Sequence, residues 1–192
     1  MANGNAPRGL VPLRHKNGAP YSGACTRYYV GTGVATNLFV GDPVLVSGSG
    51  DANGVPGVVL ATAGATNYIT GAIVGIESLT PTAILTNYHV SGTAGYVLVA
   101  DDPDLIFEIQ EDGLGAPLAG TDISENADLI AGTGSTYTGS SGWMLDSSSH
   151  GTGATLQLKI LGLEQRPDNA IGIYGKWLVE INLHSQRNPA GV

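Results

Sequence analysis

Apolar and polar residues alternate strictly in two stretches near the C-terminal end of the chain. Leu156, Leu158 and Ile160 alternate with polar neighbours, and residues 177–184 place Trp, Val, Ile and Leu at every other position. A repeat of two residues puts every second side chain on one face, which is typical of a strand that is buried on one side. We therefore expect two β-strands here, separated by a charged turn at residues 164–169.

Short apolar runs bounded by turn residues recur along the rest of the chain and indicate further strands. They lie at residues 28–30, 38–40, 43–46, 58–61, 69–76, 96–100 and 105–110. The runs at 58–61 and 69–76 look like the two strands of a hairpin. The segment 101–104, Asp-Asp-Pro-Asp, has strong turn chemistry, because aspartate and proline favour tight turns. We predict that the two runs flanking this turn pair as a second hairpin.

Signals for helices are nearly absent. Asp122 and Glu125 match an Asp-x-x-Glu capping pattern, which predicts a helix that Gly132 ends within about two turns. About ten strands, with turn signals about every 8 to 12 residues, predict an all-β protein, an antiparallel β-sandwich or barrel of jelly-roll-like form. The segment 132–153, rich in Ser, Thr and Gly, is expected to be a long surface loop.

The first 26 residues differ from the rest of the chain. They are rich in Gly, Pro and Asn, contain no acidic residue, and carry Arg8, Arg14 and Lys16. Such a segment does not sustain a helix or a central strand. We predict an extended basic N-terminal arm over residues 1–26, attached to a single acidic β-domain over residues 27–192. A disordered tail would normally lack an apolar patch such as residues 10–13, and the alternative is an edge strand folded against its own body.

Charge is sparse and unevenly distributed. Charged residues make up 12% of the chain, against about 25% in typical soluble domains. Residues 28–158 hold no Lys or Arg, and the formal net charge is −8. This charge argues against a nucleic-acid partner, because phosphate binding needs a basic face. We see no signal peptide and no apolar span of about 18 residues, so we expect synthesis in the cytoplasm and no membrane partner. One cysteine, Cys25, allows no intrachain disulfide.

We find no motif for catalysis, for a cofactor or for a metal. A Gly-x-Ser-x-Gly nucleophile motif and a Gly-Lys-Ser or Gly-Lys-Thr phosphate loop are both missing. The acidic run at residues 101–112 lacks the spacing of a calcium loop. The four histidines are never two or four residues apart, so their spacing predicts no zinc site. They are His15, His89, His150 and His184. We therefore expect no enzyme, no cofactor and no bound metal.

Several blocks of the chain resemble one group of virion proteins. The opening stretch, residues 1–15, and the following residues 17–21 resemble the start of capsid decoration, or cement, proteins of tailed double-stranded DNA bacteriophages. The blocks 96–112, 126–129 and 177–179 resemble the same group. This resemblance implies a β-rich protein without catalytic residues on the outer surface of the virion head. There it would clamp neighbouring major capsid subunits against the internal DNA pressure. It also implies a homo-oligomer, with a homotrimer favoured and a homodimer possible, made in the host cytoplasm.

In this setting the arm is the predicted contact with the major capsid protein. An apolar patch flanked by cations suits such a contact, and the predicted capsid-binding residues are Arg8, Leu10, Val11, Pro12, Leu13 and Arg14. A different interpretation is a receptor-binding or glycan-binding β-module of a phage head or tail fibre, supported by Tyr137 and Trp143 in the segment 132–153. The major capsid protein itself is disfavoured, because the chain is short and lacks a long helix.

Overall fold

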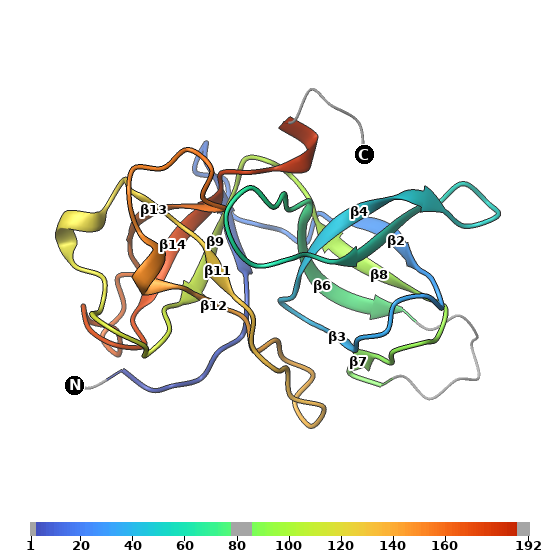
Figure 1. Cartoon of the computed structure of the whole chain (residues 1–192), viewed down its shortest axis with the longest axis horizontal. Helices are drawn as coiled ribbons and strands as arrows, with labels where there is room; N and C mark the ends of the chain where they lie inside the picture. The colour runs from blue at the N-terminus through green and yellow to red at the C-terminus, as the bar shows by residue number, and fades with distance from the viewer. Residues whose placement is uncertain (1–2, 78–85, 188–192) are drawn as a thin grey trace.

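The computed structural model describes residues 3–77 and 86–187, which form two β-lobes side by side along the long axis of the molecule (Figure 1). One lobe, the sheet lobe, is built on an open five-stranded sheet, and the other, the barrel lobe, on a closed five-stranded barrel. In these residues the helical structure is limited to three short 3-10 turns, and no helix is long and apolar enough to cross a membrane. The predicted fold class, an all-β protein with antiparallel sheets, is confirmed.

The sheet lobe contains, as neighbours, β13 (Leu158–Leu163) and β14 (Lys176–Ile181), the two strands predicted from strict alternation. All pairs in its sheet are antiparallel. Alternate residues of β14 are buried, so one face of the strand packs into the core. A two-stranded ribbon of β11 (Leu129–Ile130) and β12 (Met144–Leu145) belongs to the same lobe. The sheet consists, in spatial order, of β1 (Val11–His15), β9 (Leu105–Gln110), β14 (Lys176–Ile181), β13 (Leu158–Leu163) and β10 (Asn126–Ala127).

The barrel lobe closes because its first and last strands both find partners. β2 (Thr26–Val30) pairs with β8 (Gly95–Ala100) in an antiparallel manner and with β5 (Pro56–Leu60) in parallel, so no strand of the ring is left at an edge. A ribbon of β3 (Leu38–Phe39) and β7 (Tyr88–His89) accompanies the ring. In spatial order the ring consists of β2 (Thr26–Val30), β5 (Pro56–Leu60), β4 (Pro43–Gly50), β6 (Gly71–Glu77) and β8 (Gly95–Ala100).

The barrel lobe is inserted between two paired strands of the sheet lobe. β1 pairs with β9, with Pro12 opposite Phe107, and every barrel strand lies between them in sequence. The predicted hairpin of β8 and β9 is therefore wrong: β8 pairs with β2 and β6, whereas β9 pairs with β1 and β14. The turn between them does form, because Asp102 accepts a hydrogen bond from the Asp104 N–H at 2.8 Å. It leads the chain from one lobe into the other.

Three further local predictions differ from the structure. The runs around Val58 and Ile69 do not pair with each other, because β4 lies between β5 and β6 in the barrel. The helix expected at Asp122 is one 3-10 turn, Gly120–Asp122, and the chain leaves it through Ser124 with a φ of 79°. The segment 132–153 is not all surface loop, since Trp143 is 3% exposed and β12 follows it.

The hydrophobic core of the sheet lobe continues into the barrel lobe. Its cluster contains Leu10, Phe107 and Trp177 of the sheet lobe together with two residues of the barrel lobe. These are Ile69, which lies just before β6, and Ala100, which is the last residue of β8. A second cluster, built around the inward side chains of the barrel strands, fills the barrel itself. The two lobes are thus held together by the same apolar packing that fills each of them.

A buried carboxyl group lies within the sheet-lobe core. Glu111 is 0% exposed, and its Oε2 accepts hydrogen bonds from Trp177 Nε1 and the Leu118 N–H, both at 3.1 Å. Its Oε1 has no hydrogen-bond partner among the described residues. Burial disfavours the charged form and raises the pKa of Glu111 to about 7.

Replacing Glu111 by Gln should therefore flatten the pH dependence of stability. Folding raises the pKa of this carboxyl group from 4.5 to about 7. Its contribution to stability is therefore complete below about pH 4.5 and is lost as the pH rises through about 7. Between about pH 5 and pH 8, the free energy of unfolding of the wild type should fall by on the order of 2 kcal/mol relative to Glu111→Gln. Urea unfolding of both proteins measures this, and an equal pH dependence would contradict it.

Candidate functional site

The first part of the N-terminal arm, residues 3–15, lies along the body of the protein and is hydrogen-bonded to it. The Asn3 side chain donates a hydrogen bond to the Ala170 carbonyl at 2.8 Å, and the Gln110 side chain donates one to Asn5 at 2.9 Å. The arm then enters the sheet as β1, its edge strand beside β9. It does not extend away from the molecule, because its backbone and side-chain hydrogen bonds are made with the body. The edge-strand alternative describes this course.

Two glycines allow the arm to cross the barrel lobe at close range. Gly9 and Gly41 have φ values of 68° and 96°, and the Leu10 N–H donates a hydrogen bond to the Gly41 carbonyl at 2.9 Å. A Cβ atom added to Gly41 would lie 1.9 Å from the carbonyl oxygen of Arg8. Only glycine accommodates both the positive φ and this contact. The crossing fixes Arg8 relative to the barrel lobe.

The structure leaves most of the predicted capsid-binding residues accessible. Arg8 and Arg14 are exposed, and residues 11–13 are half-buried. Leu10, however, is 0% exposed and belongs to the core cluster of the sheet lobe. The Leu10 side chain therefore lies in the interior, where burial of its apolar surface stabilises the fold, and it is not accessible to an external partner in this structure.

A small apolar hollow adjoins this part of the arm. It measures about 250 Å³, and its lining includes Val11 and Pro12 from β1, Val40 and Val74 from the barrel lobe, and Arg8. Val40 is 39% exposed, so part of its apolar surface is open to solvent at this hollow. The hollow can take an apolar side chain of a partner while Arg8 meets a carboxylate beside it.

The basic residues near the chain ends fall into two groups by their ion pairing. In the part of the chain that the structure describes, Lys16, Arg27, Arg166 and Arg187 each pair with a carboxylate of the body. The other four cations form no ion pair there: Arg8 and Arg14, which are exposed, and Lys159 and Lys176, which are half-buried. Arg166, for example, reaches Glu108 at 2.7 Å. The four pairs are Lys16 with Glu180, Arg27 with Glu77, Arg166 with Glu108 and Arg187 with Asp104. Arg166 and Arg187, the two arginines in the C-terminal part of the chain, thus have an internal structural role.

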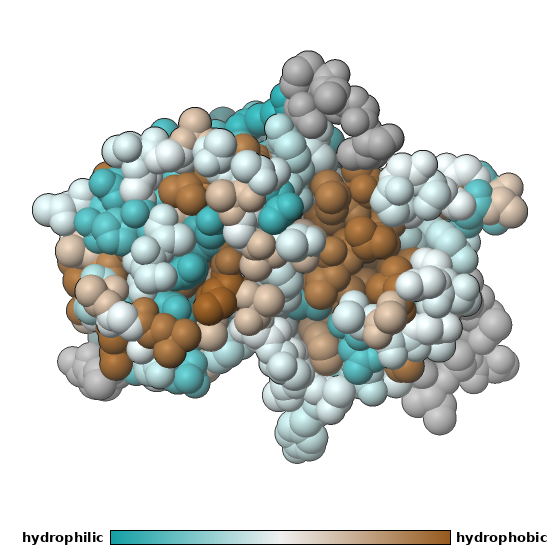
Figure 2. Space-filling model, in the orientation of Figure 1, coloured by the Kyte–Doolittle hydropathy of each residue, from teal (hydrophilic) through white to brown (hydrophobic). Residues whose placement is uncertain are grey.

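A second apolar hollow lies where the two lobes meet, and Figure 2 shows hydrophobic side chains gathered in this region. It measures about 600 Å³ and is lined by Val34, Leu60 and Ala61 on the barrel side and by Ala131 and Trp143 on the sheet side. None of its lining residues is charged. The hollow therefore offers no acid or base for catalysis.

The two aromatic residues considered for sugar binding are not equally available. Tyr137 is 91% exposed, in the segment 132–142 that projects from the body (Figure 1). Trp143 is 3% exposed and packs in the core cluster of the sheet lobe. Of the two, Tyr137 alone presents a ring face to solvent.

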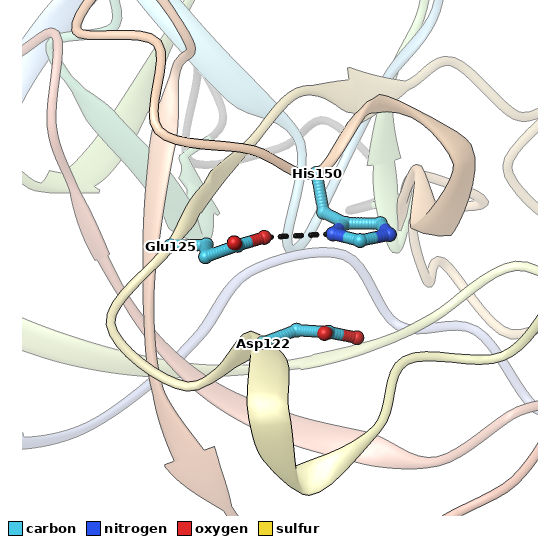
Figure 3. Close-up of side chains that lie close together, drawn as sticks. All are labelled: Asp122, Glu125 and His150. Atoms are coloured by element: carbon cyan, nitrogen blue, oxygen red, sulfur yellow. Dashed lines mark hydrogen bonds and ion pairs between the residues drawn. The ribbon is translucent and has the colours of Figure 1, made fainter.

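One group of potential metal ligands comes together in the described residues, Asp122, Glu125 and His150 (Figure 3). His150 Nδ1 lies 2.8 Å from Glu125 Oε2. The Ala119 N–H donates a hydrogen bond to Asp122 and lowers the pKa of that carboxyl group. Sequence spacing missed this group, because the histidine is 25 residues from Glu125 and a local pattern does not show that the two segments meet.

The described residues contain no hydrogen bond between a Ser, Thr or Cys side chain and a histidine ring. The polar contacts of the rings are made by Asp102 with His15, Glu125 with His150 and the Gln186 N–H with His184. A nucleophile paired with a histidine base is thus not formed in the described residues. No protein-family model, curated protein or solved structure matches this chain. Its function has to be inferred from its residues and their geometry.

Proposed function

We propose that this protein is a structural virion protein, a capsid decoration protein of a tailed double-stranded DNA bacteriophage. It binds the outer surface of the head through the major capsid protein and joins neighbouring subunits. The observation that carries the proposal is the exposed pair Arg8 and Arg14, which has no ion-pair partner in the described residues and flanks the half-buried residues 11–13. The sequence blocks that resemble decoration proteins support the same function.

The fixed course of the arm suits a binding surface. An arm that is already ordered loses little conformational entropy on binding, so more of the contact energy contributes to affinity. A specific interface buries at least about 1,000 Å² in total, and a homotrimer, or a homodimer, multiplies the contact over several capsid subunits. The net charge of −8 is compatible with a body that faces water on the outside of the particle.

Neutralising the two arm arginines should weaken capsid binding. The double variant Arg8→Gln and Arg14→Gln removes two charge-assisted contacts, each contributing about 1 kcal/mol or more, so the affinity should fall by at least about tenfold. The measurement is binding to heads prepared without this protein, by cosedimentation. Point substitutions are used because deletion of residues 2–16 would also remove β1 and the buried Leu10.

A matched control changes the net charge by the same amount elsewhere. Lys159 and Lys176 also form no ion pair within the described ranges, so the double variant Lys159→Gln and Lys176→Gln should bind heads as the wild type does. Equal losses in both double variants would point to a general charge effect. Undiminished binding of the arginine variant would overturn the proposed contact.

A receptor-binding or glycan-binding module is the second candidate function. The exposure of Tyr137 on a projecting segment favours it, because an exposed ring face can stack on a sugar. Its support is reduced by the burial of Trp143. Binding of the protein to a glycan array, lost in Tyr137→Ala, would favour this function over decoration.

A further inference from the structure

Glu125 and His150 are held together by the backbone on either side of them. Their neighbours, Asn126 and Gly151, exchange two backbone hydrogen bonds, one at 2.8 Å and the other at 2.9 Å. This pair fixes the 125–126 segment against the segment that follows the 3-10 turn Ser147–Ser149. The side chains of Glu125 and His150 therefore meet as a consequence of main-chain pairing.

Asp122 is brought to the same place by the turn that precedes Glu125. The Glu125 N–H donates a hydrogen bond to the Asp122 carbonyl at 3.1 Å, and Ser124 between them has a φ of 79°. The Asp122 carboxylate accepts one hydrogen bond from the Ala119 N–H and one from the Thr121 hydroxyl. Because each carboxylate oxygen has two lone pairs, both oxygens keep one lone pair available for a further contact.

The charges of this cluster are not balanced within the described part of the chain. Asp122 and Glu125 form no ion pair with a Lys or Arg there, and His150 is the only basic group that contacts either carboxylate. The carboxylates are half-buried and His150 is exposed. Two carboxylates at close range repel each other, and a cation between them would remove this cost.

We propose that Asp122, Glu125 and His150 bind a divalent transition-metal ion of the Zn²⁺ type. The ligand atoms of the three side chains all lie within 4.8 Å of one another. Zn²⁺ forms bonds of about 2.0–2.2 Å to imidazole nitrogen and carboxylate oxygen, so small side-chain rotations bring all three ligands onto one ion. An imidazole beside two carboxylates favours Zn²⁺ over Ca²⁺ and Mg²⁺, which prefer oxygen ligands alone.

The bound ion would join two loops of the sheet lobe. It would link residues 119–125 to residues 146–151, which otherwise meet through the Asn126–Gly151 backbone pair and the Glu125–His150 contact. Three protein ligands leave one position of a tetrahedral ion for water or for a side chain of a neighbouring molecule. A ligand that binds the folded protein and not the unfolded chain raises the unfolding temperature.

The test uses the full chain after treatment with EDTA and dialysis. Isothermal titration with ZnCl₂ should show one ion per wild-type chain, and thermal unfolding should shift upward in excess Zn²⁺ and return on addition of EDTA. Glu125→Gln and His150→Ala should each lower the affinity by at least about tenfold, because each removes a metal ligand. Circular dichroism of each variant without metal checks that the fold is retained.

A matched control is provided by a second His–carboxylate pair. His15 Nδ1 lies 3.0 Å from Asp102 Oδ2, but no third ligand joins this pair in the described residues. His15→Ala should therefore bind Zn²⁺ as the wild type does. The proposal is overturned if the wild type takes up no Zn²⁺, or if Glu125→Gln and His150→Ala bind it as tightly as His15→Ala.

Discussion

Gly41→Ala should release the N-terminal arm from the body. The new Cβ atom would lie 1.9 Å from the carbonyl oxygen of Arg8, at a φ of 96° that alanine rarely adopts. Either the arm moves away or the rim of the barrel lobe is distorted. We expect a loss of stability on the order of 3 kcal/mol and faster tryptic cleavage after Arg8. Urea unfolding and timed proteolysis followed by mass spectrometry measure the two effects.

The control for this prediction is Gly54→Ala. Gly54 also has a positive φ, 83°, but a Cβ atom there meets nothing within 4 Å. It should cost only about 1 kcal/mol of backbone strain and leave cleavage after Arg8 unchanged. If the two variants behave alike, the close crossing of Gly9 and Gly41 does not hold the arm in place. Under the proposed function, Gly41→Ala should also bind heads more weakly than Gly54→Ala.

Trp177→Ala should destabilise the protein strongly. Trp177 is 0% exposed at the centre of the sheet lobe, and its indole N–H donates a hydrogen bond to the buried Glu111. Truncation leaves a large cavity and removes one of the two donors to that carboxylate, so we expect a loss of about 3–5 kcal/mol. Urea unfolding followed by circular dichroism measures the change.

Tyr137→Ala is the matched aromatic truncation outside the core. The Tyr137 side chain is 91% exposed, so its removal should change the free energy of unfolding by less than about 0.5 kcal/mol. A loss of less than about 1 kcal/mol in Trp177→Ala would mean that the sheet-lobe core does not depend on this residue for its packing.

The strand content could be predicted from local patterns, but the pairing of strands could not. The alternation around Ile160 and Val179 identified β13 and β14, because alternation reports which side of a strand is buried. The turn at residues 101–104 was also predicted from the sequence, but it connects β8 of the barrel lobe to β9 of the sheet lobe. Turn chemistry fixes the local backbone, whereas the partner of a strand depends on residues far away in the sequence.

The residues of the candidate sites were also only partly predictable from the sequence. The basic and apolar character of residues 8–14 was visible in the sequence, and arginines in such a segment are expected to be exposed, as Arg8 and Arg14 are. The burial of Leu10 was not, because it depends on a contact with Gly41, 31 positions further along the chain. The cluster of Asp122, Glu125 and His150 was missed for the same reason, since the pairing of Asn126 with Gly151 brings its members together.

The sequence by itself determined that this is an all-β chain with a basic opening segment and an acidic body, since periodicity, turn residues and charge are local properties of the chain. Only the tertiary structure decided that the barrel lobe is inserted between β1 and β9, that the arm is an edge strand of its own body, and which cations remain without internal partners. These features depend on long-range packing and backbone pairing, which local sequence patterns do not specify.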